Sequence, residues 1–163
     1  MADPALRVVL YHIPMFSAVP IPIPVIARLS EAFPGTFTGL KDSSGDLANM
    51  TALIDAFPGL AVLAGADPLM LPLLRKGGAG CITATSNLIA GDLAFIYRHH
   101  ADPSQAEAVD AAQARVVAAR NRVSILPQLP SIKALLAQKT GNSAWALVRP
   151  PLLPLTDEEV ARV

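Results

Sequence analysis

The protein has 163 residues, of which 52% are hydrophobic, with 13 basic and 13 acidic side chains and a mean hydropathy of +0.43. This length is typical of one domain with a large core, and the balanced charge argues against binding to nucleic acid or to an anionic membrane. Cys81 is the only cysteine, which excludes an internal disulfide or a cysteine metal site and fits a reducing cytoplasm. The N-terminus has no secretory signal pattern, and no apolar run approaches the length of a membrane span.

The first predicted strand is Leu6–Ile13, a run rich in β-branched and large apolar residues that stops at a proline. Both of its faces are apolar, which is typical of a parallel strand covered on both sides. We expect a proline-rich loop over Met15–Pro24. A short amphipathic helix over Val25–Phe33 follows, ended by a Pro-Gly pair.

The second predicted strand, Thr36–Lys41, ends in a lysine and precedes the turn formers DSSG. Asp46 is a good N-cap for a helix over Leu47–Phe57. If the Lys41 side chain points into a core or barrel, its amine is held in a partly apolar site. A lysine held in this way can attack carbonyl carbons as a nucleophile. The alternative is a strand-end lysine that reaches solvent.

The third predicted strand is Leu60–Gly65. Asp67 then reads as an N-cap, because Pro68 suits the first position of a helix that runs to about Lys76.

The fourth predicted strand is Gly80–Ala84, followed by a loop over Thr85–Ile89 and a helix over Gly91–His100. Strand, loop, helix and a Pro or Gly stop have then recurred four times. Strict alternation of strands and helices predicts an α/β fold with a parallel sheet and right-handed crossovers.

Beyond Pro103 the strand signal disappears. Helices are predicted over Ser104–Arg122 and Pro130–Lys139, with Gly141 as a plausible C-cap of the second. An extended segment over residues 149–154 precedes Thr156 and Glu159, whose spacing forms a capping box for a last short helix.

These motifs together resemble the dihydrodipicolinate synthase and N-acetylneuraminate lyase family of class I aldolases. The matching segments are LYHIP at residues 10–14, GLKDSSGD at 39–46, GAD at 65–67, GGAGCIT at 77–83 with Asn87, IKALL at 132–136 and VRPPL at 148–152. The resemblance implies a (β/α) TIM-barrel family, with a half barrel of the last four βα units over residues 1–102 and a C-terminal helical appendix over 103–163. A full barrel typically needs ~250 residues. We therefore expect the first four units, with their carboxylate-binding residues, to be absent.

The resemblance also implies the chemistry. Lys41 matches the family lysine that forms an imine with pyruvate or a related 2-oxo acid, so a covalent imine replaces any cofactor and no metal is required. Tyr11 matches the proton-relay tyrosine, although a core tyrosine bonded to the backbone is an alternative. Both residues end neighbouring strands, where barrel active sites lie.

Four further residues match substrate-binding positions: Ser43, Gly65, Asp67 and Ile82, the last through its backbone carbonyl. For Ser43 a role in shaping the turn is the preferred explanation, and Asp67 is equally explained as an N-cap.

Two departures bear on the substrate. Phe16 stands where the synthase has an arginine for a dicarboxylic substrate, and Pro68 stands where the sialic acid lyase has a glutamate for the sugar chain. A less polar or shorter 2-oxo acid, or an aldehyde acceptor with an apolar tail facing Met15 and Phe16, is favoured over the substrates of those two enzymes.

Three functional hypotheses remain open. The first is a Schiff-base-forming lyase or aldolase, and the second is an inactive half-barrel fragment or split-barrel component. The third is a non-catalytic regulator that binds 2-oxo acids. An open half barrel exposes strand edges and apolar surface, so we expect a homo-oligomer or a complementing half-barrel chain.

Overall fold

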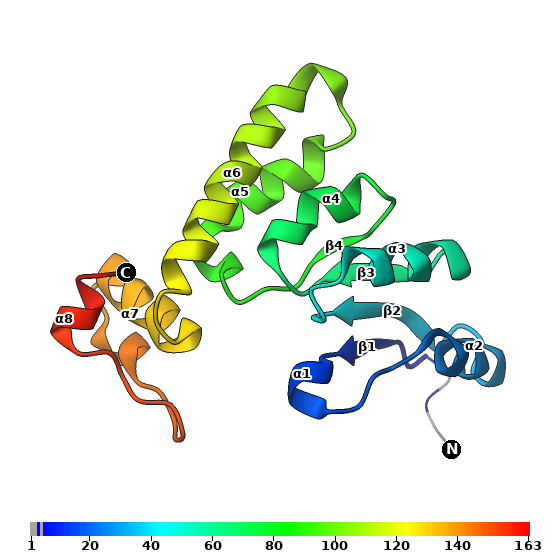
Figure 1. Ribbon diagram of the computed structural model, residues 1–163, viewed down its shortest axis with the longest axis horizontal. Coiled ribbons are helices and arrows are strands. Elements are labelled where there is room, and N and C mark those ends of the chain that lie inside the picture. The colour runs from blue at the N-terminus through cyan, green and yellow to red at the C-terminus, as the bar shows by residue number, and fades with distance from the viewer. Residues whose placement is uncertain (1–2, 4) are drawn as a thin grey trace. The chain divides into compact units, whose positions relative to one another are not determined.

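The computed structural model of the protein describes residue 3 and residues 5–163. The chain divides into two compact units, with the boundary between Thr83 and Ala84 (Figure 1). The expected family division at residue 102 stays a prediction. The two compact units divide earlier because the helix after residue 85 packs against the helices that follow it.

The N-terminal unit contains one parallel sheet in the order β1-β2-β3-β4. Its elements are β1 (Val8–His12), α1 (Pro14–Ser17), α2 (Ile23–Ala32), β2 (Phe37–Asp42), α3 (Leu47–Ala56), β3 (Ala61–Ala64), η1 (Asp67–Leu69), α4 (Met70–Leu74) and β4 (Gly80–Cys81). The predicted parallel sheet and its helical connections are therefore confirmed. The fourth strand is shorter than predicted, and the predicted loop after β1 contains the short helix α1.

The helix α3 begins where its sequence predicts. Asp46 adopts an extended backbone, and its side chain accepts hydrogen bonds from the backbone N–H groups of Ala48 at 2.9 Å and Asn49 at 3.2 Å. These two N–H groups have no partner within the helix, which explains the preference for aspartate at this position.

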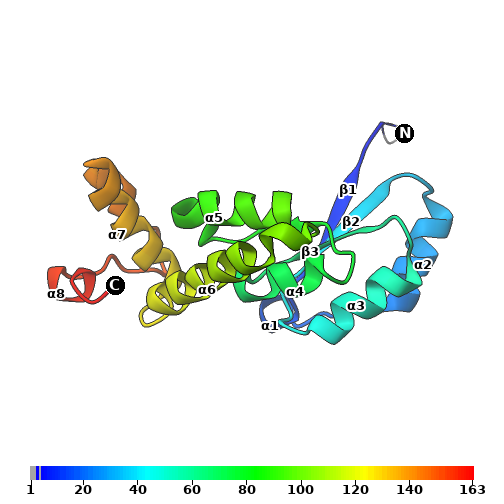
Figure 2. The ribbon, with the colours of Figure 1, turned by 90° about the horizontal axis from the view of Figure 1, so that it is seen from above.

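Helices α2, α3 and α4 cover one face of the sheet (Figure 2). The core consists of Ile26, Leu40, Met50, Leu53, Val62, Ala64 and Leu73, all at most 1% exposed. Because side chains alternate along each strand, the neighbouring positions point to the opposite face. There Val9 and Tyr11 are 48% and 50% exposed, so the prediction that the first strand is covered on both faces was wrong for the described structure.

The C-terminal unit is helical. Its elements are α5 (Ser86–His99), η2 (Pro103–Gln105), α6 (Ala106–Val123), α7 (Gln128–Thr140), η3 (Ser143–Ala146) and α8 (Asp157–Val160). The helix expected over Gly91–His100 begins five residues earlier, with a non-helical Ile89 inside it. Gly141 caps α7 in the left-handed conformation, and the predicted capping box of Thr156 and Glu159 is present.

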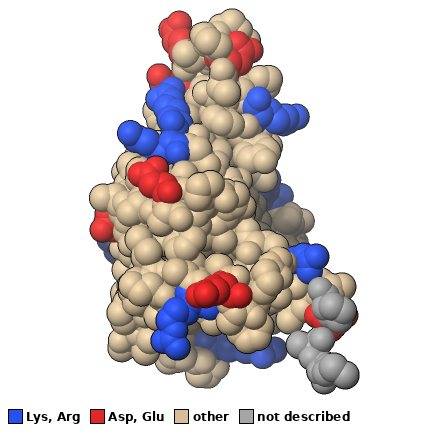
Figure 3. Space-filling model, turned by 90° about the vertical axis from the view of Figure 1, so that its right-hand side faces the viewer, with Lys and Arg blue, Asp and Glu red and all other residues tan. Residues whose placement is uncertain are grey.

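Charged residues make up 16% of the chain. Basic and acidic side chains are interspersed on the face drawn in Figure 3. Among the described residues, none of the helices combines the length and the apolar character that crossing a membrane requires.

Candidate active site

Tyr11 and Lys41 lie side by side at the carboxyl ends of β1 and β2. They are register partners in the parallel pairing, and the Lys41 Nζ atom lies 3.9 Å from the centroid of the Tyr11 ring. Both side chains project from the face that α2–α4 leave uncovered. The structure thus brings together the two residues that the sequence predicted as nucleophile and proton relay, in a cation–π contact.

Ser43 completes this group from the turn after β2. Its backbone N–H donates to the carbonyl oxygen of His12 at 2.8 Å, and its buried hydroxyl has no aligned hydrogen-bond partner among the described residues. Burial acts to raise the pKa of the Tyr11 phenol. The nearby Ser43 hydroxyl, the Lys41 amine and the Lys41 charge together outweigh burial, so the Tyr11 pKa lies below its usual value. The contact between the two hydroxyls is close but poorly aligned, as is common before a substrate binds.

Gly65 lies directly against Ser43. Its backbone N–H donates to the Asp42 carbonyl oxygen at 2.7 Å. A Cβ at Gly65 would collide with Ser43 Oγ and would lie 2.8 Å from the Asp42 oxygen. The position requires glycine because two backbone segments approach each other closely there.

Ile82 occupies the equivalent place directly after β4, with its backbone N–H donating to the carbonyl oxygen of Ala64 on β3 at 2.9 Å. Its side chain is 47% exposed. The carboxyl ends of the consecutive strands therefore bring together Tyr11, Lys41, Ser43, Gly65 and Ile82. Their functional roles stay predictions.

Asp67 is not the N-cap that the sequence allowed. It is fully buried at the first position of η1, the cap position is Ala66 without a side-chain hydrogen bond, and Asp67 Oδ1 accepts from Thr83 Oγ1 at 2.5 Å. Burial and the negative charge of Asp67 raise the pKa of the Cys81 thiol to about 11. Asp67 thus joins the loop after β3 to the segment after β4. Cys81, predicted as a core residue, is partly buried and packs against the core.

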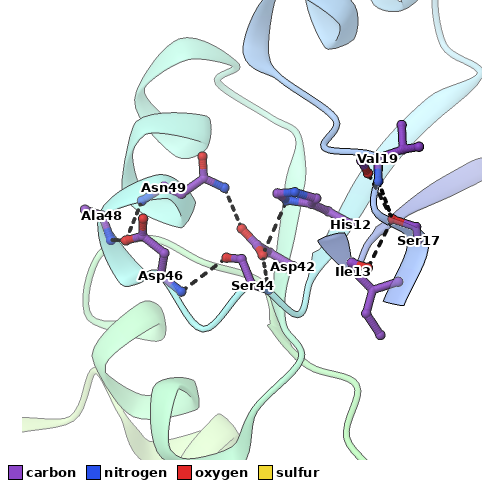
Figure 4. A network of polar contacts seen from close by, with 9 residues as sticks. All are labelled: His12, Ile13, Ser17, Val19, Asp42, Ser44, Asp46, Ala48 and Asn49. Carbon is purple, nitrogen blue, oxygen red and sulfur yellow. Dashed lines mark hydrogen bonds and ion pairs between the residues drawn. The ribbon is translucent and has the colours of Figure 1, made fainter. Parts of the chain in front are cut away.

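A buried polar network that the sequence did not single out lies next to this group (Figure 4). The Asp42 carboxylate accepts from the Ser44 backbone N–H and the Asn49 side chain, both at 2.7 Å, and its Oδ1 atom lies 3.5 Å from His12 Nδ1. Alternation along the strands places His12 and Asp42 on the same face. Their burial, however, depends on how α3 packs.

The described residues contain no group of three or more His, Cys, Asp or Glu side chains placed to hold a metal ion. Lys41 is the residue on which the resemblance would place a covalent imine.

The profile of the Dihydrodipicolinate synthetase family matches residues 1–163. An uncharacterized DapA-like lyase of Chloroflexus aurantiacus is 41% identical over 155 residues, covering 95% of this chain and 50% of the relative. The 4-hydroxy-tetrahydrodipicolinate synthase of Kineococcus radiotolerans is 33% identical over 162 residues, covering 96% and 49%.

Solved structures agree with these matches. A dihydrodipicolinate synthase from Bacillus anthracis superposes with a TM-score of 0.85 at 29% identity, covering 97% of this chain and 53% of the other. A 2-keto-3-deoxygluconate aldolase from Sulfolobus, in complex with D-KDPG, gives a TM-score of 0.82 at 25% identity and covers 95% and 50%. The chain spans about half the length of the curated relatives it matches.

Proposed function

The chain belongs to the dihydrodipicolinate synthetase family, and from this premise we propose that it supplies the catalytic lysine of a Schiff-base-forming lyase or aldolase acting on pyruvate or a related 2-oxo acid. One observation carries the proposal. The Lys41 amine lies 3.9 Å from the Tyr11 ring centroid, at the strand ends where barrel enzymes bind substrates.

The proposed reaction begins when the Lys41 amine, after giving up one proton, adds to the ketone carbon of the 2-oxo acid. The resulting carbinolamine loses its hydroxyl as water and becomes an iminium. The iminium accepts the electron pair of the adjacent carbon–carbon bond when that bond breaks, and returns the pair when a bond to an acceptor forms. The Tyr11 phenol, with its lowered pKa, is suited to carry the protons that these steps move.

Neighbouring residues support a substrate class for this proposal. The related proteins named above are a synthase of 4-hydroxy-tetrahydrodipicolinate and an aldolase bound to D-KDPG. In this chain Met15 and Phe16, on α1 directly after β1, are 70% and 81% exposed. Their position supports an acceptor with an apolar tail or a short 2-oxo acid, since neither side chain can pair with a second carboxylate.

A second candidate function is a half barrel that is inactive until it is closed. The uncovered sheet face exposes Val9, Tyr11 and Ile82 by about half each, and β1 and β4 are edges of the described sheet. Four further strands would cover this face and pair these edges. They would come from a second copy or from another chain that completes the barrel.

Intact mass after incubation with pyruvate and borohydride tests the proposal. A reduced adduct is expected on the wild type and on Lys76→Ala, which removes an exposed lysine, but not on Lys41→Ala. Tyr11→Phe should slow adduct formation about 10²- to 10⁴-fold, the range for loss of a general acid–base. No adduct on folded protein would contradict the proposal and favour the inactive half barrel.

A further inference from the structure

The buried pair of His12 and Asp42 lies one residue beyond the proposed catalytic pair. Tyr11 pairs with Lys41 and His12 pairs with Asp42 as consecutive partners in the β1–β2 register. Because side chains alternate along a strand, the first pair faces the uncovered side and the second faces the helices. Any change that moves one pair along the strand moves the other with it.

Asp42 brings a carboxyl group into the protein interior. It is fully buried, and a buried carboxylate is unfavourable unless it is paired and hydrogen-bonded. Two of its partners, Ser44 and Asn49, come from the turn and helix that follow it. The remaining polar neighbour is His12, which comes from the adjacent strand (Figure 4).

His12 is likewise a buried polar side chain that requires a polar partner. It is 7% exposed, and within the described chain neither ring nitrogen forms an aligned hydrogen bond. Nδ1 lies 3.5 Å from Asp42 Oδ1, so Asp42 is the group toward which the imidazole is directed. Removing Asp42 would leave the buried imidazole without its nearest polar group, and removing His12 would leave Asp42 with the hydrogen bonds from Ser44 and Asn49 alone.

The register of β1 is less constrained than that of β2 or β3, which each pair with two strands. The strand β1 is an edge of the sheet and pairs with β2 alone, and its register shifts between Val8 and Val9. The pairing at the start of the strand therefore does not fix the pairing at its end. A slip of one residue would move Tyr11 to the opposite face and away from Lys41.

We propose that His12 is a positioning residue, which through Asp42 fixes the register of β1 against β2 and so holds Tyr11 beside Lys41. This inference rests on the proposed function for its catalytic consequence, but its structural content stands apart from it. Buried polar pairs are well attested as devices that specify register.

The first experiment needs no substrate. In a Tyr97→Phe background, where Tyr11 is the remaining tyrosine, absorbance of the tyrosinate reports the Tyr11 pKa. His12→Leu should raise this pKa in the same direction as Lys41→Met, since either change separates the phenol from the Lys41 amine and charge. His12→Asn, which keeps a donor for Asp42, should stay close to the wild type. His100→Leu, in the C-terminal unit, is the matched control.

The second experiment measures borohydride-trapped pyruvate adduct on the same variants. His12→Leu should form it about ten- to a hundredfold more slowly, as expected for a small misplacement of reacting groups, and His12→Asn should restore most of the rate. If the wild type forms no adduct, the proposed function fails while the Tyr11 titration still tests the positioning role.

An unmoved Tyr11 titration in folded His12→Leu would overturn the inference. His12→Met, whose flexible side chain packs more easily, serves if His12→Leu does not fold. Failure of both apolar variants to fold would show that the pair supports the whole sheet, and would also overturn a specific positioning role.

Discussion

Replacing Gly65 by alanine tests how closely the turn after β2 packs against the end of β3. The added Cβ would collide with Ser43 Oγ and would lie 2.8 Å from both the Asp42 carbonyl oxygen and Ser43 Cα. Real Cβ atoms essentially never come within 3.0 Å of such neighbours. Because two of the three atoms belong to the backbone, rotating one side chain cannot relieve the overlap.

The expected loss of stability has two contributions. Overpacking of this kind typically costs about 1–3 kcal/mol. The backbone shift that relieves it would also weaken the 2.7 Å hydrogen bond from Gly65 N–H to Asp42, at a cost of about 0.5–1.5 kcal/mol. The free energy of unfolding from urea denaturation should therefore fall by about 1.5–4.5 kcal/mol.

Two variants control this measurement. Gly91 lies in α5 with no atom within 4 Å of a Cβ, so Gly91→Ala should stabilise the protein by up to about 1 kcal/mol through helix propensity. Adding Ser43→Gly to Gly65→Ala should recover only part of the lost stability. It removes the collision with Ser43 Oγ, but the close contacts of the new Cβ with the Asp42 oxygen and Ser43 Cα remain. A Gly65→Ala protein as stable as the wild type would refute the close approach of the two segments.

Four further outcomes are expected. Asp46→Ala should lower the free energy of unfolding by about 0.5–2 kcal/mol, the usual cost of a lost N-cap, and an unchanged urea midpoint would contradict the cap. Because the pKa of Cys81 is raised to about 11, iodoacetamide near neutral pH should alkylate it far more slowly in folded than in urea-unfolded protein. The stability due to this raised pKa is complete below the ordinary thiol pKa and should decline as the pH rises towards about 11. Arg115→Ala should leave the midpoint of thermal unfolding almost unchanged, since the Arg115 side chain is mostly exposed in its ion pair with Asp92.

The parts of the fold that the sequence predicted depend on neighbours in the chain. Asp46 caps α3 with N–H groups two and three residues away, and Thr156 and Glu159 cap each other across a single turn. Such local chemistry can be read from residue types and spacing alone. The four strands were also predicted, because short apolar runs between Pro or Gly stops leave few alternatives.

The parts that were not predicted depend on contacts between distant segments. Asp67 followed by Pro68 has the sequence of an N-cap, yet the Asp67 carboxyl group bonds Thr83, sixteen residues further on. The strand β1 has apolar residues on both faces, but whether a face is covered is decided by elements outside the strand. The burial of His12 beside Asp42 likewise follows from the packing of α3, which local periodicity does not encode.

The position of the site, in contrast, follows from the parallel topology itself. Ser43, Gly65 and Ile82 each follow a strand and donate a backbone N–H to the last part of the preceding strand, at His12, Asp42 and Ala64. Because each N–H group makes the same kind of hydrogen bond, the three residues lie at the same distance along their strands. Their side-chain positions are on the face of the sheet from which Lys41 projects. Each motif is short and weakly specific, since it only has to form the turn and the backbone hydrogen bond at the end of one strand. Their order along the chain is highly specific, because one repeated hydrogen-bond pattern fixes all of them at once.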